Sequence, residues 1–273
     1  MNNYHFSVLL SVYNKENPSF LRESLDSIYS QSLQPNEVVL VKDGPLTEEL
    51  NKCIEYYQHK FSTFKVISLS TNSGLGKALN EGLKHCTCEL VARLDTDDIA
   101  KPNRFKKQIN IFKDNPNIDV CSSWIEEFEN DIENILATKK LPEYHKDIEK
   151  YAKHRCPINH PAVMYKKEAV LRVGGYSGFP EDYCLWIKML MNGAIFYNIQ
   201  ESLLYFRFSR DVIKRRGGWE YAKADIKSQL SFYKMGFISI VTLIYNILIR
   251  VSVRLIPYSL RSYTYRKLLR NNE

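Results

Sequence analysis

Three aspartates stand close together after an apolar stretch, in the segment VARLDTDD at residues 91–98. Asp is a common turn residue, so one interpretation is a solvated loop that begins at Asp95. Three carboxylates in four residues repel one another, however, and hard divalent cations prefer oxygen ligands. The other interpretation is a cation site, in which Asp95 and Asp97 converge on a divalent metal that also holds phosphate oxygens.

Other polar residues follow the apolar runs of the first hundred residues in a similar way. These runs predict β-strands at 6–13, 37–44, 64–70 and 89–95. The helical spacing of apolar residues between them predicts helices at 19–33, 46–61 and 72–86. Strands that alternate with helices over short connections form a parallel sheet covered on both faces, and ligands bind at the carboxyl ends of its strands. The polar residues expected to share one crevice there are Asn14, Asp43, Asn72 and the segment from Asp95 to Asp98.

The second half of the chain is less regular. It predicts a strand at 117–128, a strand and short helix at 160–176, a helix at 180–193, an extended segment at 194–208 and a helix at 219–236. The expected organisation is one domain at 1–208, with a nucleotide-binding half at 1–100 and an acceptor half at 101–208, followed by a basic, amphipathic helical region at 209–273.

Positive charge is concentrated towards the C-terminus. The 273-residue chain has a formal net charge of +7, and the part from Arg207 onward holds 14 Lys and Arg against 4 Asp and Glu. Such a region suits nucleic acid, anionic lipid or a phosphorylated substrate. Its apolar run at 237–249 is shorter than the roughly 20 residues that span a bilayer. Arg250 and Arg254 suit a helix lying in the headgroup layer, and the alternative is a helix packed on the protein's own core.

The motifs of two common nucleotide-binding classes are absent. The sequence contains no GxxxxGK[ST], which argues against a P-loop NTPase. The run NSGLGKALN has only Gly74 and Gly76, so there is no GxGxxG. If Asp95 and Asp97 hold a divalent ion together with diphosphate oxygens, the substrate is a nucleotide and the metal helps a phosphate to leave.

Five motifs, taken together and in order, resemble the inverting sugar-nucleotide glycosyltransferases of family 2. Within about residues 4–208 they read FSVLLSVYN, VLVKDG, NSGLGKALNEG, VARLDTDD and FPEDYCLW. The resemblance implies a GT-A-type nucleotide-sugar-binding fold, in the α/β class, with a mostly parallel central sheet flanked by helices and a DxD motif that binds Mn²⁺ or Mg²⁺. One departure is at Arg207, which is followed by Phe208 and Ser209 where many members have Arg-x-His.

The resemblance implies roles for residues of the nucleotide-binding half. Those expected at the nucleotide sugar are Val12, Tyr13, Asn14, Asp43, Asn72, Gly74, Lys77, Arg93 and Asp95. Among them, Asp43 would accept a hydrogen bond from the base, and Asp95 would reach the ribose or the metal. Asp97 would be the metal ligand proper. Taken singly, such residues also have ordinary interpretations, because Asp43 begins a good turn and Asn72 is a good helix cap.

A second acidic pair, Glu181 and Asp182, stands at the start of an expected helix. The helix macrodipole favours acids there, so a simple cap is one interpretation. In the resembled family the Asp of this pair is the general base. Asp182 would then remove a proton from the acceptor hydroxyl as it attacks the anomeric carbon, and Glu181 would assist in acceptor binding. A single displacement would invert the anomeric centre and give a β-linkage from an α-linked donor.

The resemblance also covers residues near the acceptor. His160 would lie close to it, with a core histidine as the alternative, and Trp186 would stack on a sugar face or pack internally. Arg215 and Arg216 would hold phosphates bidentately. Their segment is similar to one in bacterial transferases that build surface polysaccharides on undecaprenyl diphosphate, so the expected partner is a lipid-linked sugar such as GlcNAc-diphosphate-undecaprenol.

The combined interpretation is a peripheral enzyme on the cytoplasmic face of the bacterial inner membrane. It would transfer a hexose, galactose from UDP-galactose in the first instance, during O-antigen or capsule synthesis, with glucosyl and rhamnosyl transfer left open. A nucleic-acid-binding protein is disfavoured, because the apolar run at 237–249 has no place on a phosphate backbone. A catalytically silent scaffold is disfavoured because Asp95, Asp97 and Asp182 occur together.

Overall fold

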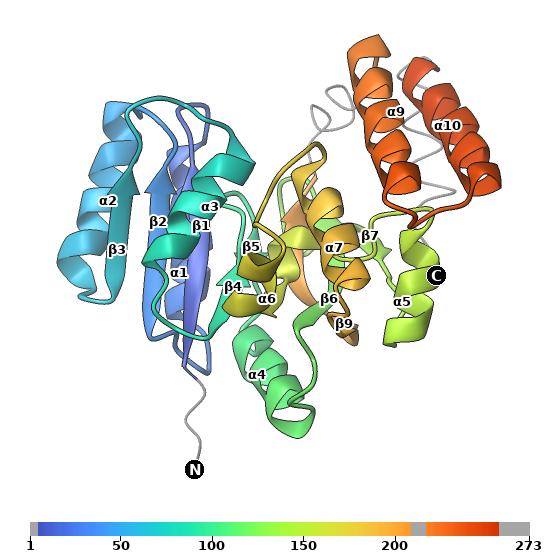
Figure 1. Ribbon diagram of the computed structural model, residues 1–273. Coiled ribbons are helices and arrows are strands. Elements are labelled where there is room, and N and C mark those ends of the chain that lie inside the picture. Colours follow the sequence, from blue (N-terminus) through green and yellow to red (C-terminus); the bar gives the residue numbers. More distant parts are fainter. Residues whose placement is uncertain (1–4, 209–216, 257–273) are drawn as a thin grey trace.

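The computed structural model describes residues 5–208 and 217–256 of the chain. One nine-stranded sheet forms its centre, with helices on both faces and a helical hairpin beside one end (Figure 1). The strands lie in the order β3-β2-β1-β4-β8-β6-β9-β5, and β7 pairs with β6 outside this path. The expected α/β architecture, a sheet flanked by helices, is therefore confirmed.

The first four strands are parallel to one another, as the sequence predicts. They are β1 (Phe6–Val12), β2 (Glu37–Lys42), β3 (Phe64–Ser68) and β4 (Leu90–Arg93). The helices between them are α1 (Pro18–Tyr29), α2 (Glu48–Lys60) and α3 (Leu75–His85). Successive side chains of β1 point to opposite faces. Val8 therefore joins the core beneath α1 and α2, whereas Leu9 joins the core beneath α3.

Beyond β4 the sheet is mixed, which corrects the expectation of a mostly parallel sheet. The strands there are β5 (Ile99–Ala100), β6 (Val120–Phe128), β7 (Ile135–Lys139), β8 (Met164–Lys166) and β9 (Phe196–Arg207). β8 runs antiparallel to both neighbours, β4 and β6, whereas β6 and β9 are parallel. The connection between β6 and β7 is short, and a short connection joins antiparallel strands only.

Helices of the second half continue both layers. They are α4 (Arg104–Asp114), α5 (His145–Ala152), the 3₁₀ turn η1 (His160–Ala162), α6 (Lys167–Arg172) and α7 (Glu181–Met191). α4 packs on the face covered by α1, and α7 packs on the face covered by α3. α7 begins after Pro180, and its first turn holds Glu181 and Asp182, where acids complement the helix dipole.

The C-terminal hairpin consists of α9 (Trp219–Lys234) and α10 (Ile240–Leu255). It lies beside α5 and α7 (Figure 1). It packs on them through a small separate core formed by Ala152, Tyr183, Cys184, Ile187, Phe232, Ile238 and Leu243. Among residues 5–208 and 217–256, no helix combines the length and the apolar character that a bilayer crossing needs. The hairpin thus lies against α7, the helix that begins with Glu181 and Asp182.

Candidate active site

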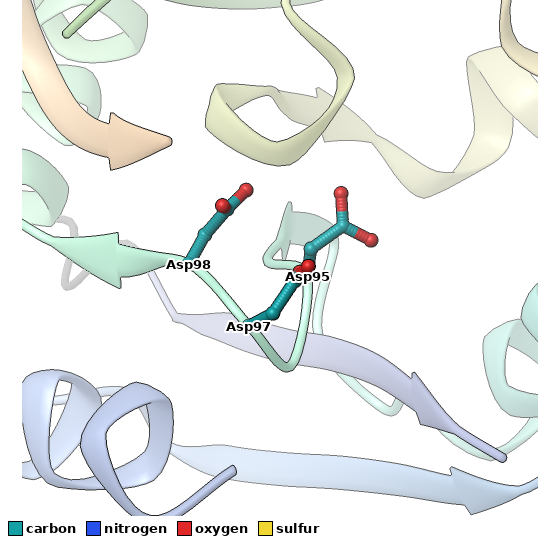
Figure 2. Close-up of side chains that lie close together, drawn as sticks. All are labelled: Asp95, Asp97 and Asp98. Carbon is teal, nitrogen blue, oxygen red and sulfur yellow. The ribbon is translucent and has the colours of Figure 1, made fainter. Parts of the chain in front are cut away.

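The loop after β4 brings three carboxylates together (Figure 2). Asp95, Asp97 and Asp98 each offer one oxygen atom, and these atoms lie within 4.8 Å of one another. Burial, with the charges of Asp95 and Glu16, raises the pKa of Asp97 to about 7. Burial and the charge of Asp97 hold the pKa of Asp98 well above its usual range. Such a cluster of oxygen ligands gains from a bound cation, because the cation offsets their mutual repulsion.

Arg93 supports this loop from inside the protein. Its side chain is fully buried and its guanidinium forms an ion pair with Asp95, while its backbone N–H donates to Val163 O over 2.9 Å. The Arg93 side chain has no exposed surface in this structure, and its expected contact with the nucleotide sugar stays a prediction. Its place in the sheet makes it a positioning residue for Asp95.

Arg207, at the end of β9, holds the same loop from the other side. Its backbone N–H donates to Asp98 Oδ1 over 2.8 Å, and its Nε donates to Asp97 O over 2.9 Å. The guanidinium also pairs with Glu23. It lies between two rings, 3.9 Å from the centroid of Phe20 and 4.5 Å from that of Phe128. Nothing in the spacing of the sequence indicates this role, since the partners come from distant segments.

The ends of β1 and β2 and the loop before α3 meet at the same edge of the sheet. The buried Asp43 carboxylate accepts hydrogen bonds from Ser73 N over 2.7 Å and Gly74 N over 3.0 Å. Asn72 Nδ2 donates back to Asp43 O over 3.2 Å. Gly44 has φ +87°, and a Cβ there would lie 2.6 Å from Asn72 N, so only glycine fits this close approach. Asp43 and Asn72 thus share one site, as the strand ends predict.

The remaining residues of the nucleotide-binding half differ in exposure. Val12 is buried, and its carbonyl accepts Asp43 N–H over 2.8 Å, so it contributes backbone structure. Tyr13 is half-buried, whereas Asn14 and Lys77 are exposed. Lys77 lies in the first turns of α3, beside the loop that Asp43 holds. A base or phosphate contact from the three side chains stays a prediction.

One cavity connects the acidic loop with the start of α7. It measures about 390 Å³, and its lining includes Asp95, His160, Glu181 and Asp182. Asp182 is half-buried, and Cys156 Sγ lies 3.6 Å from its Oδ2. Burial raises the pKa of Glu181. The α7 start also lies against the α3 start, since a Cβ on Gly76 would meet Glu181 Cβ at 3.4 Å. The structure thus places both acidic groups at one site.

His160 and Trp186 lie behind this cavity. His160 Nε2 is 3.1 Å from Tyr176 Oη, and burial holds the imidazole pKa well below its usual range, so the ring is neutral. His160 also contributes to the cavity lining, and its expected contact with the acceptor stays a prediction. Trp186 has no exposed surface and packs edge-on against His160, with 6.0 Å between ring centroids. The expectation that Trp186 stacks on the acceptor sugar is therefore wrong, and the packing alternative holds.

The two expectations for the basic region have different outcomes. Arg215 and Arg216 lie outside the described residues. Arg250 and Arg254, expected in a lipid headgroup layer, instead face the protein and pair with the buried Asp225. Both arginines line the cavity that holds Asp182. The two arginines therefore contact the protein itself, as the alternative of a helix packed on the protein's own core predicts, and not a headgroup layer.

Four parallel strands whose ends carry an acidic loop, with a second acidic pair across one cavity, form an arrangement typical of sugar-nucleotide-dependent glycosyltransferases. Residues 7–173 match Glycosyl transferase family 2. The chain belongs to this family. The UDP-Gal:alpha-D-GlcNAc-diphosphoundecaprenol beta-1,3-galactosyltransferase of Escherichia coli is 45% identical over 267 residues, which cover 97% of this chain and 96% of the relative.

Solved structures of similar proteins share the fold. TarS of S. aureus superposes with a TM-score of 0.60 at 22% identity, over 81% of this chain and 42% of TarS, so this chain spans less than half of that protein. A mannosyltransferase from Pyrobaculum calidifontis, in complex with GDP-Man and Mn²⁺, gives a TM-score of 0.67 at 18% identity, over 91% of this chain and 70% of the other. These likenesses concern the fold alone.

Proposed function

We propose that this protein is an inverting galactosyltransferase. It transfers galactose from UDP-galactose to the GlcNAc of a lipid-linked GlcNAc-diphosphate and forms a β-1,3 linkage. The observation that carries the proposal is that Asp95, of the acidic loop, and Asp182, at the start of α7, line one cavity. The substrates named for the E. coli relative support the choice of donor, acceptor and linkage, because the two chains match over nearly their whole lengths.

The donor binds at the ends of β1, β2 and β4. Asp43 keeps the loop at Ser73 and Gly74 in place beside it. Asp97 and Asp95 would hold a divalent ion, Mn²⁺ or Mg²⁺, and the pKa of Asp97, which burial and the neighbouring carboxylates raise, fits a site that gains from added positive charge. When bound, this ion neutralises charge on the leaving diphosphate. Arg93 and Arg207 keep the acidic loop in the conformation that presents its oxygens.

Asp182 is the general base. Its carboxylate takes the proton of the acceptor hydroxyl while that oxygen attacks the anomeric carbon. The bond from the anomeric carbon to UDP breaks on the opposite face, so the α-linked galactose of the donor becomes β-linked. Glu181 and the neutral His160 line the same cavity and orient the acceptor sugar by hydrogen bonds.

The proposed place of action is the cytoplasmic face of the bacterial inner membrane, with the protein bound peripherally. The product is then an early intermediate of a surface polysaccharide such as O antigen or capsule. A surface of the protein supports this: α10 exposes a row of large apolar side chains that consists of Ile240, Val241, Ile244, Tyr245, Leu248 and Ile249. Such a row on one helix suits the boundary between headgroups and acyl chains.

A donor panel tests the proposal. Purified protein is given a synthetic GlcNAc-diphosphate-lipid and one of UDP-galactose, UDP-glucose or dTDP-rhamnose, with Mn²⁺ or with a chelator. We expect nucleotide release and product formation with UDP-galactose and Mn²⁺ only. Transfer of glucose or rhamnose instead would refute the assignment of UDP-galactose as the donor. Undiminished turnover with chelator would refute the requirement for a metal ion, and an α-linked product would refute inversion. No transfer from any donor would refute the transferase assignment for this acceptor.

A further inference from the structure

The catalytic cavity extends from Asp182 to the C-terminal hairpin. Its lining there includes Tyr221 and Asp225 of α9 and Arg250 and Arg254 of α10. The acidic loop at the other part of the cavity suits a cation, whereas two guanidinium groups suit an anion. One cavity therefore offers two regions of opposite charge, and only the acidic region is used by the donor as described above.

A buried carboxylate holds the two arginines in place. Asp225 is 1% exposed, with Arg250 Nη1 at 3.2 Å from its Oδ1 and Arg254 Nε at 2.7 Å from its Oδ2. Arg250 Nη2 also donates to His154 O over 2.8 Å. The arginine side chains keep 17% and 12% of their surface exposed. Asp225 thus holds both guanidinium groups at the cavity wall from behind.

The arginines lie close to aromatic rings near the start of α7. Arg250 Cζ is 5.5 Å from the ring centroid of Tyr183, which follows Asp182 directly in α7. Arg254 Cζ is 4.5 Å from the ring centroid of Tyr221, and this ring lies 5.5 Å from that of Phe179, just before α7. Asp182 and both arginines line the same cavity. An acceptor sugar whose hydroxyl contacts Asp182 can therefore place the diphosphate on its anomeric carbon beside Arg250 and Arg254.

Arg250 also borders a second hollow, of about 440 Å³, on the flank of α10. Its apolar lining comes from Val241, Tyr245 and Ile249, one helical turn apart from one another along α10. A cation that separates a polar cavity from an apolar groove matches a molecule in which a phosphate group separates a sugar from a hydrocarbon chain.

We propose that Arg250 and Arg254 bind the diphosphate of the lipid-linked acceptor, that Asp225 positions both guanidinium groups, and that the first part of the lipid chain lies in the groove at Val241 and Tyr245. This inference rests on the proposed function, since it concerns the acceptor of that reaction. It assigns acceptor recognition to two inward-facing residues of a helix whose opposite face is apolar.

The kinetic test uses the full chain and separates the diphosphate from the sugar. Two acceptors are compared at saturating UDP-galactose: a GlcNAc-diphosphate-lipid and an alkyl GlcNAc glycoside without phosphate. In Arg250→Gln and in Arg254→Gln we expect kcat/KM for the diphosphate acceptor to fall about tenfold or more. The values for the glycoside and the KM for UDP-galactose should stay unchanged. Lys227→Gln removes one positive charge from an exposed position of α9 and serves as the matched control.

The single variants guard against a failure to fold, because the remaining arginine still pairs with Asp225. An equal loss for both acceptors, or an equal loss in the Lys227→Gln control, would overturn the inference. Arg250→Lys should restore part of the preference for the diphosphate, because charge is kept while the bidentate geometry is lost.

A binding measurement keeps the inference testable if no turnover is found. Isothermal titration calorimetry with a short polyprenyl diphosphate that carries no sugar needs no catalysis. We expect wild-type protein to bind it, and Arg250→Gln and Arg254→Gln to bind it about tenfold more weakly. Failure of the wild-type protein to bind, or equal binding by all variants, would overturn the diphosphate site. Binding without any sugar transfer would instead leave the site standing and refute the proposed function.

Discussion

The backbone N–H of Arg207 donates to Asp98 Oδ1 over 2.8 Å, and this contact ties the end of β9 to the acidic loop after β4. The Arg207 side chain completes the connection at Asp97 O, 2.9 Å from Nε. β4 and β9 are not neighbours in the sheet, but β9 pairs with β5, the strand that follows the acidic loop. Geometry of the acidic loop therefore depends on a residue of the acceptor half.

Arg207→Gln should loosen this loop. The variant loses the pairing with Glu23 and the contacts with the Phe20 and Phe128 rings, which we expect to cost about 2 kcal/mol in the free energy of unfolding. Titration of activity with Mn²⁺ should show a weaker apparent metal affinity. Arg172→Gln, on an exposed position of α6, is the control. Unchanged thermal unfolding and an unchanged Mn²⁺ titration would refute the positioning role.

The pKa of Asp97 makes a pH-dependent prediction. In the unfolded chain Asp has its ordinary pKa near 4, whereas the folded value is about 7. The folded protein therefore binds the extra proton between these values, and stability contributed by the group is lost as pH rises through about 7. Asp97→Asn, measured with chelator, should be increasingly more stable than wild type from about pH 4 to about pH 8. A difference that stays constant with pH would contradict this assignment.

The same pair of proteins tests metal binding without catalysis. Added Mn²⁺ should raise the unfolding temperature of the wild type at neutral pH more than that of Asp97→Asn, because a ligand that binds only the folded state stabilises it. Equal responses of the two proteins would show that Asp97 does not hold the ion.

Gly44→Ala should disturb the loop before α3. The residue has φ +87°, and the new Cβ would lie 2.6 Å from Asn72 N, so the backbone must shift. We expect a loss of about 1–2 kcal/mol in the free energy of unfolding from the backbone conformation alone. The Kd for UDP-galactose should rise as well, because Asp43 holds this loop. Gly193→Ala, also at positive φ but with open space around it, should lower stability without changing the Kd.

The exposed face of α10 predicts binding to membranes. Ile244→Glu and Leu248→Glu place charge on side chains that are 54% and 63% exposed, so folding should be kept. Sedimentation with anionic vesicles should show less bound protein than for wild type, while activity on a soluble short-chain acceptor is kept. Leu136→Glu, at a 47% exposed position of β7, is the matched control. Equal sedimentation of all four proteins would refute the membrane role of this face.

The sequence predicts the first half of the fold well because its signals are local. Each of β1 to β4 is a short apolar run, and parallel pairing brings Asp43, Asn72 and Asp95 to one edge of the sheet. Contacts between distant segments are not visible in this way. The Arg207–Asp98 contact joins the end of β9 to the acidic loop, which no periodicity relates, and the mixed pairing of β8 depends on the path of the chain.

The arginines of α10 show the same limit at the level of one helix. Periodicity reveals an apolar face and a basic face, but it does not say which face is covered. The partner that draws Arg250 and Arg254 inward is Asp225, on a different helix. The prediction for Trp186 shows a related limit, since an aromatic residue after an acidic pair suits a sugar contact and a core position equally well. Here the Trp186 side chain is fully buried.

The central claim is that Asp182 is the base of a reaction whose donor is held at Asp95. The most direct test is Asp182→Asn, an isosteric change that removes the basic oxygen. The account predicts that kcat for transfer from UDP-galactose falls about 100-fold or more. The Kd for UDP-galactose with Mn²⁺ should remain that of the wild type, because the donor contacts lie at the other acidic group. A kcat close to that of the wild type would contradict the account.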